Sequence, residues 1–183
     1  MQRVFKTWLT RIGAHVSARA IHRVNAALNY LEVGRWMAAQ GFDTSRRVID
    51  RHEIYAQIAS ELGEQRVLYL EFGVHRGESM RMWSQLLRHP DSQLHGFDSF
   101  EGLPEDWTVI DGKGTFSTGG AEPVLSDRRV RFFRGWFADT LPGYTPPAHE
   151  RLVLHLDADL YTSTKTVLDA LEREIVPGSF VLF

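Results

Sequence analysis

The stretch VLYLEFGVHRGESM (residues 67–80) decides the fold, because it reads as a buried strand that passes through a glycine-containing turn into a helix. Residues 67–72 are apolar apart from Glu71, a pattern typical of a strand that is covered on both faces. Gly73 and Gly77 lie in the turn, where they let a ligand approach the backbone next to the free N–H groups of the helix N-terminus. A generic tight turn is the alternative, and the spacing is not the dinucleotide pattern G-x-G-x-x-G.

The same alternation continues along the chain and predicts the fold class. Short apolar runs predict strands at residues 67–72, 93–97, 130–133, 152–156 and 180–183. Helical periodicity at residues 78–87 and 163–175 separates them. We therefore expect an α/β fold with a doubly wound, mainly parallel, Rossmann-like sheet. The chain stops inside the last apolar run, so we expect further C-terminal strands to be missing.

Upstream of the first strand, the apolar spacing predicts two helices, over residues 17–37 and 46–62. The expected organisation is a basic helical arm over residues 1–45 and one catalytic or binding domain over residues 46–183. Residues 101–126 contain several glycines and little periodicity. A loop of that length is usually functional, and we expect a mobile lid.

Composition narrows the function. The chain has 183 residues, of which 43% are hydrophobic, and a net charge of -2, which gives no whole-protein reason to expect nucleic-acid binding. It has no cysteine, so a metal would need oxygen or imidazole ligands. The apolar runs are too short to span a bilayer.

The arm has five basic residues and no acid before Leu31. It lacks the uninterrupted apolar stretch and cleavage site of a signal peptide, so we expect a cytoplasmic protein. A solvated helix or packing against a second subunit in a homo-oligomer is the simpler interpretation of the arm, and weak attraction to an anionic membrane is the alternative.

Acidic residues follow two of the predicted strands. Asp98 ends the second strand, where a doubly wound fold directs a carboxylate at the ribose hydroxyls of an adenosine ligand. With Glu71 nearby, a negative site favours a cationic cofactor over a pyrophosphate.

Asp157 and Asp159 follow the strand at residues 152–156 and can face the same side of the sheet edge. They suggest a hard cation or a proton acceptor. The structural alternative is helix capping, by Thr162, Ser163 or Asp159.

Several blocks together resemble a known family: EFGVHRGESM (71–80), GFDSFEGLPE (96–105), GWFADTLP (135–142), HLDADLYTST (155–164) and PGSFVLF (177–183). In this order they are similar to the macrocin O-methyltransferases, S-adenosylmethionine-dependent enzymes that methylate sugar hydroxyls of antibiotics and related saccharides. The resemblance covers residues 46–183.

The resemblance implies a role for particular residues. Glu71, Gly73 and Gly77 would line the methionine part of S-adenosylmethionine, and Asp98 would hold its ribose. Ser99 and Phe100 would flank the adenosine, and Trp136 or Phe137 would stack on the adenine.

For catalysis, the resemblance implies that Asp157 is a magnesium ligand, while Asp159 or His155 assists proton removal. The acidic pair that the family places after the fifth strand is absent. The alternatives are a methyltransferase for another small acceptor and a cofactor-binding fragment that lacks the metal site. The glycine spacing disfavours a nicotinamide dehydrogenase.

Overall fold

A computed structural model describes residues 2–43, 45, 48 and 50–183 of this chain. The described chain divides into two compact units. One contains residues 1–47 and 108–111, and the other contains residues 48–107 and 112–183. The predicted boundary between residues 45 and 46 touches Arg46, which lies outside the described residues, so it stays a prediction.

The first unit contains two helices, α1 (Gln2–Gly13) and α2 (Ala18–Ala39). The hydroxyl of Ser17 accepts a hydrogen bond from the backbone N–H of Ala20 and caps α2. The helix predicted over residues 17–37 is confirmed, and Gln40 is its C-cap.

The second unit is a five-stranded, all-parallel sheet in the order β3-β2-β1-β4-β5. Its strands are β1 (Val67–Phe72), β2 (Gln93–Asp98), β3 (Val130–Arg134), β4 (Arg151–Leu156) and β5 (Phe180–Leu182). Its helices are α3 (Arg51–Leu62), α4 (Glu78–Leu86), the one-turn α5 (Phe137–Thr140) and α6 (Tyr161–Leu171), with a 3-10 turn η1 (Leu141–Gly143). This arrangement confirms the predicted doubly wound, mainly parallel fold.

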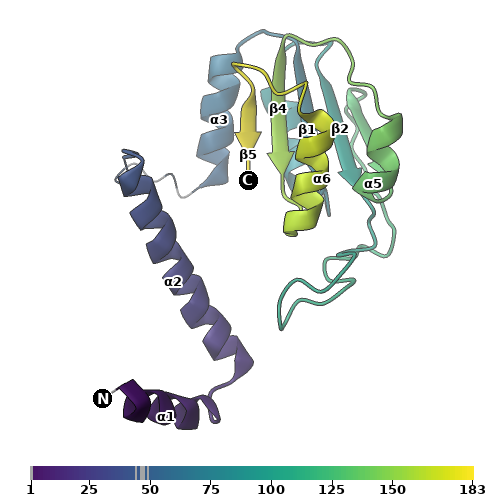
Figure 1. Ribbon diagram of the computed structural model, residues 1–183. Helices are drawn as coiled ribbons and strands as arrows, with labels where there is room; N and C mark the ends of the chain where they lie inside the picture. Colours follow the sequence, from purple (N-terminus) through teal and green to yellow (C-terminus); the bar gives the residue numbers. More distant parts are fainter. Residues whose placement is uncertain (1, 44, 46–47, 49) are drawn as a thin grey trace. The chain divides into compact units, whose positions relative to one another are not determined.

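Helices cover the two faces of the sheet in separate layers (Figure 1). On one face, α3 and α4 pack on Val67 and Tyr69 of β1. On the other face, α5, η1 and α6 pack on Leu68, Leu70 and Phe72. Because side chains alternate along a strand, β1 supplies both cores and is buried at every position.

Two predicted helices have different bounds in the structure. The helix expected over residues 46–62 begins at Arg51, after the Asp50 cap, and Arg46, Arg47 and Ile49 lie outside the described residues. The helix expected from Ser163 begins two residues earlier, at Tyr161. The short helix α5 was not expected, since four residues are too few for a periodic pattern.

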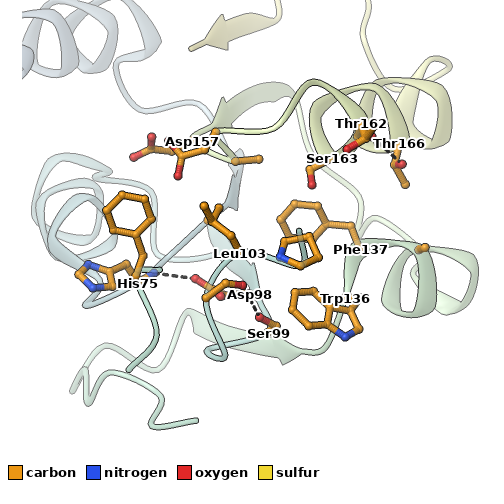
Figure 2. Close-up of a pocket in the computed structure, with 17 residues that line it drawn as sticks. His75, Asp98, Ser99, Leu103, Trp136, Phe137, Asp157, Thr162, Ser163 and Thr166 are labelled. Atoms are coloured by element: carbon orange, nitrogen blue, oxygen red, sulfur yellow. Dashed lines mark hydrogen bonds between the residues drawn. The ribbon is translucent and has the colours of Figure 1, made fainter. Parts of the chain in front are cut away.

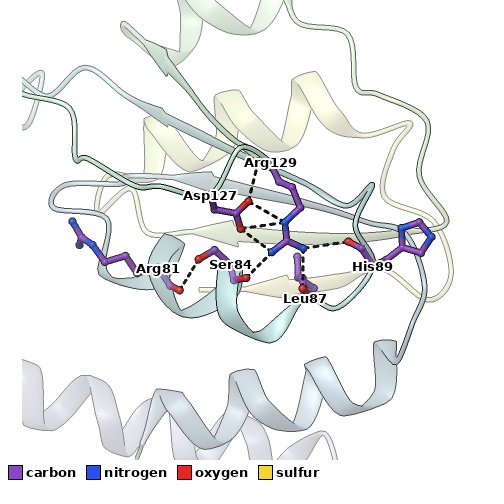
Figure 3. Close-up of polar contacts among 6 residues, drawn as sticks. All are labelled: Arg81, Ser84, Leu87, His89, Asp127 and Arg129. Carbon is purple, nitrogen blue, oxygen red and sulfur yellow. Dashed lines mark hydrogen bonds and ion pairs between the residues drawn. The ribbon is translucent and has the colours of Figure 1, made fainter.

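An arginine ties the end of α4 to the start of β3 (Figure 3). The guanidinium of Arg129 donates to the carbonyl oxygens of Ser84, Leu87 and His89, at 2.6, 2.8 and 3.2 Å. These carbonyls lie at the helix C-terminus, where backbone acceptors lack intrahelical partners. Arg129 also pairs with Asp127 at 2.7 Å, and its side-chain hydrogen bonds lower the pKa of that carboxyl. The hydrogen bonds of Arg129 therefore fix the position of the chain between the end of the long loop and the start of β3.

That loop, residues 101–126, is described throughout and contains turns and bends without helix or strand. Backbone hydrogen bonds link Leu103 N–H to Thr115 O and Gly120 N–H to Phe100 O, at 2.9 Å each. Gly102 has φ +85°, and a Cβ there would come within 2.6 Å of the backbone of Gly114. Whether the loop moves as a lid stays a prediction.

Candidate functional site

A cavity of about 450 Å³ opens at the carboxyl edge of the sheet, where β1, β2 and β4 end (Figure 2). Ligands bind at this edge in open α/β folds, and the volume is in the range of small-molecule sites. The lining residues come from the strand ends, the long loop, α5 and α6: Gly73, His75, Asp98, Ser99, Gly102, Leu103, Pro104, Phe116, Trp136, Phe137, Ala138, Asp157, Ala158, Asp159, Thr162, Ser163 and Thr166.

Asp98 is held in place by the backbone on either side of it. Its Oδ2 accepts from the backbone N–H of His75 and its Oδ1 from that of Phe100, both at 2.7 Å. Each carboxylate oxygen still has a second lone pair for a ligand hydroxyl. The side chain is half-buried and lines the cavity, so its carboxylate is oriented before any ligand arrives.

Gly73 brings the end of β1 against the end of β4. Its φ is +96°, and a Cβ on it would lie 2.0 Å from the carbonyl oxygen of Asp157. No side chain fits there without moving the backbone. The glycine therefore sets the cavity floor and the spacing between the two strand ends.

An aromatic wall forms one side of the cavity. Trp136 and Phe137 both line it, at the start of α5 (Figure 2). Phe137 packs edge-on against Phe72 of β1, at 5.3 Å between ring centroids. Ser99 lines the cavity, whereas Phe100 is buried and packs against Phe132.

The two acids that follow β4 both line the cavity and both are exposed. The backbone N–H of Asp157 donates a hydrogen bond to the carbonyl oxygen of Phe72, at 2.9 Å, which ties this turn to the end of β1. Asp159 has a positive φ of 58°. Seven of the residues expected from the sequence therefore line the same cavity: Gly73, Asp98, Ser99, Trp136, Phe137, Asp157 and Asp159.

Glu71 and Gly77 do not line the cavity. The Glu71 side chain is 0% exposed and lies in a polar cluster under the sheet edge. Its carboxyl accepts from the hydroxyls of Tyr69 at 2.9 Å and Ser79 at 2.7 Å. Burial raises the pKa of Glu71 to about 8, although the two hydrogen bonds act in the opposite direction and lower it. Gly77 is the N-cap of α4, with φ +71°.

His155 belongs to the same buried cluster. Its Nδ1 is 2.9 Å from the Tyr69 hydroxyl and its Nε2 is 3.4 Å from the Tyr55 hydroxyl. Burial lowers the pKa of the imidazole, since a buried ring disfavours its charged form. The histidine is not among the cavity-lining residues, so it does not face a ligand directly.

The residues present do not form a magnesium site by themselves. Among the residues that the structure describes, no group of three or more His, Asp or Glu side chains gathers in a way that could hold a metal ion. Asp157 could supply one carboxylate, with Asp159 beside it. Magnesium is usually held by one or two carboxylates completed by waters and substrate oxygens.

Sequence reasoning missed the third wall of the cavity, which is made by hydroxyl-bearing residues of α6. Thr162, Ser163 and Thr166 line it, at the i, i+1 and i+4 positions of one helix face. The alternative that Thr162, Ser163 or Asp159 caps this helix is wrong, because the N-cap is Leu160, with no side-chain cap hydrogen bond. The Thr162 hydroxyl instead donates to Glu105 of the long loop, at 2.9 Å.

Comparison with known proteins supports the resemblance seen in the sequence. The family model described as macrocin O-methyltransferase (TylF) matches residues 120–183. A Streptomyces olivaceus protein named 8-demethyl-8-(2,3-dimethoxy-alpha-L-rhamnosyl)-tetracenomycin-C 4'-O-methyltransferase is 37% identical over 133 residues, which are 62% of this chain and 50% of that protein.

Two further relatives are similar. Demethyldecarbamoylnovobiocin O-methyltransferase of Streptomyces niveus is 32% identical over 62% of this chain and 50% of its own length. Mycinamicin III 3''-O-methyltransferase of Micromonospora griseorubida is 34% identical over 51% of this chain and 35% of its own length. The chain spans about half the length, or less, of the curated relatives it matches.

Proposed function

We propose that this chain is part of an S-adenosylmethionine-dependent O-methyltransferase of the macrocin type, acting on a hydroxyl of a sugar or glycosylated small molecule. The observation that carries the proposal is the convergence of Gly73, Asp98 and Trp136 on one cavity at the carboxyl edge of the sheet. A close backbone approach, a fixed carboxylate and an aromatic face suit an adenosine ligand with a cationic tail.

In this proposal each group has a separate task. Asp98 accepts hydrogen bonds from the two ribose hydroxyls, and Trp136 offers a face for the adenine. Gly73 lets the end of β1 lie against the backbone of Asp157 and so forms the cavity floor beside which the methionine part would lie. Glu71 is one layer below the cavity, so its contribution is to orient the β1 turn through Ser79 and Tyr69.

Methyl transfer is an in-line displacement. The acceptor oxygen forms a bond to the methyl carbon while the carbon–sulfur bond breaks, and its electron pair returns to sulfur, which becomes a neutral thioether. The acceptor hydroxyl loses its proton, which we assign to the Asp157 carboxylate, with Asp159 assisting from the same turn. Alignment of the two reactants contributes up to roughly 7–11 kcal/mol to such a reaction.

Magnesium assistance was expected from the resemblance, and the described donor set does not complete such a site. Asp157 could act as one ligand or as the proton acceptor, and its exposure at the cavity suits both roles.

The acceptor class rests on the relatives. The Streptomyces olivaceus protein is named for methylating a rhamnosyl group, and we propose a glycoside for this chain also. The hydroxyl groups of α6 and the aromatic side chain of Phe116 in the loop give the cavity both polar and apolar surface. Self-association through α1 and α2 stays a prediction.

Calorimetry tests the cofactor. We expect S-adenosylmethionine to bind and NAD not to bind, and Asp98→Ala to weaken binding by about 1.5–3 kcal/mol, the usual contribution of hydrogen bonds to a charged group. Asp98→Asn keeps the shape of the side chain and removes its negative charge, so it shows how much of the loss is due to the charge. Asp91→Ala is the control, because Asp91 is exposed and lies outside the cavity. Unchanged affinity in a folded Asp98→Ala protein would show that the ribose assignment is wrong.

Mass spectrometry tests the reaction. With a library of rhamnosyl and related glycosides, we expect a product heavier by one CH2 unit, because a methyl group replaces the hydroxyl proton. We expect Asp157→Asn to lose turnover while it keeps cofactor affinity. Equal loss of binding and turnover would instead assign Asp157 to the cofactor.

A further inference from the structure

The helix α1 has two chemically different faces. With 3.6 residues per turn, five apolar residues fall within one arc of about 140°: Val4, Phe5, Trp8, Leu9 and Ile12. Lys6 and Arg11 border this arc on opposite sides. A helix of this length is about 18 Å long at 1.5 Å per residue, so it is suited to lying on a surface and is too short to cross a bilayer.

The apolar face of α1 is uncovered. Its five side chains are between 40% and 75% exposed, and the rings of Phe5 and Trp8 stack on each other at 6.1 Å between centroids. Large apolar side chains that gather on one exposed face usually mark an interaction surface. The apolar face of α1 is therefore suited to contact with another apolar surface.

The charges around this face identify the partner chemistry. The chain has no Asp or Glu before Glu32, and five Lys and Arg residues precede that position. A second copy of α1 would bring the same positive charges together and would be repelled. An anionic surface is complementary to the charges. Trp and Phe on the apolar side, with Lys and Arg beside them, form the pattern of a helix that lies in the lipid headgroup region.

We propose that α1 is an interfacial helix that docks this protein on an anionic lipid bilayer, with Phe5 and Trp8 inserted among the headgroups and Lys6 and Arg11 on the lipid phosphates. Arg19 and Arg23 at the start of α2 add two further positive charges close to the surface. The proposal is independent of the methyltransferase function, since it uses no residue of the cavity.

Vesicle cosedimentation of the full chain tests the proposal. One set of vesicles is neutral phosphatidylcholine, and the other contains about one third phosphatidylserine. We expect binding only to the anionic vesicles and a steep loss of binding as salt is raised. Equal binding to both sets, or binding to neither, overturns the proposal.

Two double variants separate the charge from the apolar face. Lys6→Glu with Arg11→Glu should weaken binding to anionic vesicles about tenfold or more, since each basic residue near the surface contributes about a factor of five. The matched control is Arg128→Glu with Arg173→Glu, which makes the same charge change at exposed positions elsewhere. Equal weakening by both pairs would mean a net-charge effect and would overturn the assignment to α1.

Phe5→Ser with Trp8→Ser should abolish binding while the thermal unfolding of the sheet unit stays unchanged. Brominated lipids should quench the tryptophan fluorescence of the native protein more than that of the Trp8→Phe variant. The difference between the two reports insertion of the Trp8 ring. Two outcomes would assign the face to a protein partner and overturn the proposal: a dimer in ultracentrifugation that Phe5→Ser with Trp8→Ser dissociates, or capture by an acidic protein without vesicle binding.

Discussion

Trp83 and Trp8, one from each unit of this chain, differ in how far the same type of side chain is buried. Trp83 is 0% exposed and packs at 5.0 Å from the ring of Tyr69 and at 5.3 Å from that of Tyr55. Trp8 is 56% exposed and its ring contact is with Phe5 on the same helix. Both tryptophans lie on amphipathic helices, but α4 belongs to the unit that contains the sheet, and the described residues of the other unit form no strand.

This difference shows that the amphipathic sequence pattern of a helix does not determine how far its apolar side chains are buried. An amphipathic pattern shows that a helix has an apolar face, and it does not show what covers that face. In the sheet unit, parallel strands supply the partner, and polar groups such as Glu71 and Arg129 are then enclosed as well. In α1 the face stays available for another surface.

The largest expected effect is at Trp83. Trp83→Ala should lower the free energy of unfolding by about 5 kcal/mol, because it removes a fully buried ring and leaves a cavity between α3, α4 and the sheet. Urea denaturation followed by circular dichroism measures it. A loss below about 1 kcal/mol would mean that the core does not depend on this ring as the packing indicates.

The next effect is the pH dependence that Glu71 introduces. Its folded pKa of about 8 lies above the value of 4.5 for an exposed carboxyl, so the folded protein binds a proton that the unfolded chain releases between these pH values. Stability should be highest below pH 4.5 as far as this group is concerned, and should fall by up to about 4 kcal/mol as pH rises to 8.

Glu71→Gln should remove that part of the pH dependence, because the amide keeps the volume and does not ionise. Denaturation at several pH values measures it, and Glu122→Gln in the exposed part of the loop is the control. The same slope in native protein and in Glu71→Gln would contradict the buried, protonated carboxyl.

Arg129 gives a smaller effect at the border between the core and the long loop. Arg129→Ala should cost about 3 kcal/mol, because it removes the donor from three carbonyls at the end of α4 and leaves Asp127 without its ion pair. Arg129→Lys should cost less. If Ala and Lys were equally harmful, the fork geometry of the guanidinium would be the essential feature.

The smallest effect is expected at Trp8. Trp8→Ala should change the free energy of unfolding of the sheet unit by less than about 0.5 kcal/mol, since an exposed side chain leaves no cavity behind. Differential scanning calorimetry compares it with Trp83→Ala. A large destabilisation would remove the contrast between the two units and would show that α1 packs on a protein surface.

Within the described ranges, no helix combines the length and the apolar character that crossing a membrane requires. The proposed docking of α1 is at a lipid surface and does not need such a helix.

The sequence by itself determined the strands, the parallel α/β fold class and several of the residues that line the cavity. Short apolar runs separated by helical periodicity leave few other arrangements, and in a parallel sheet the residues that follow the strands meet at one edge. For that reason the sequence predicts that Gly73, Asp98, Asp157 and Asp159 lie at one edge of the sheet, and all four line the cavity.

Only the tertiary structure decided how these acids differ. Glu71 precedes the end of β1 by one residue and points into the layer with Tyr69 and Ser79, whereas Asp98 and Asp157 line the cavity. In the sheet register Glu71 pairs with Gly96 and His155, two residues before Asp98 and Asp157. Its side chain is therefore enclosed within the layer, whereas the other two carboxylates lie at the strand ends. The hydroxyl wall of α6 likewise became visible only when the helix was packed beside the strand ends, because proximity across the chain is not encoded in local periodicity.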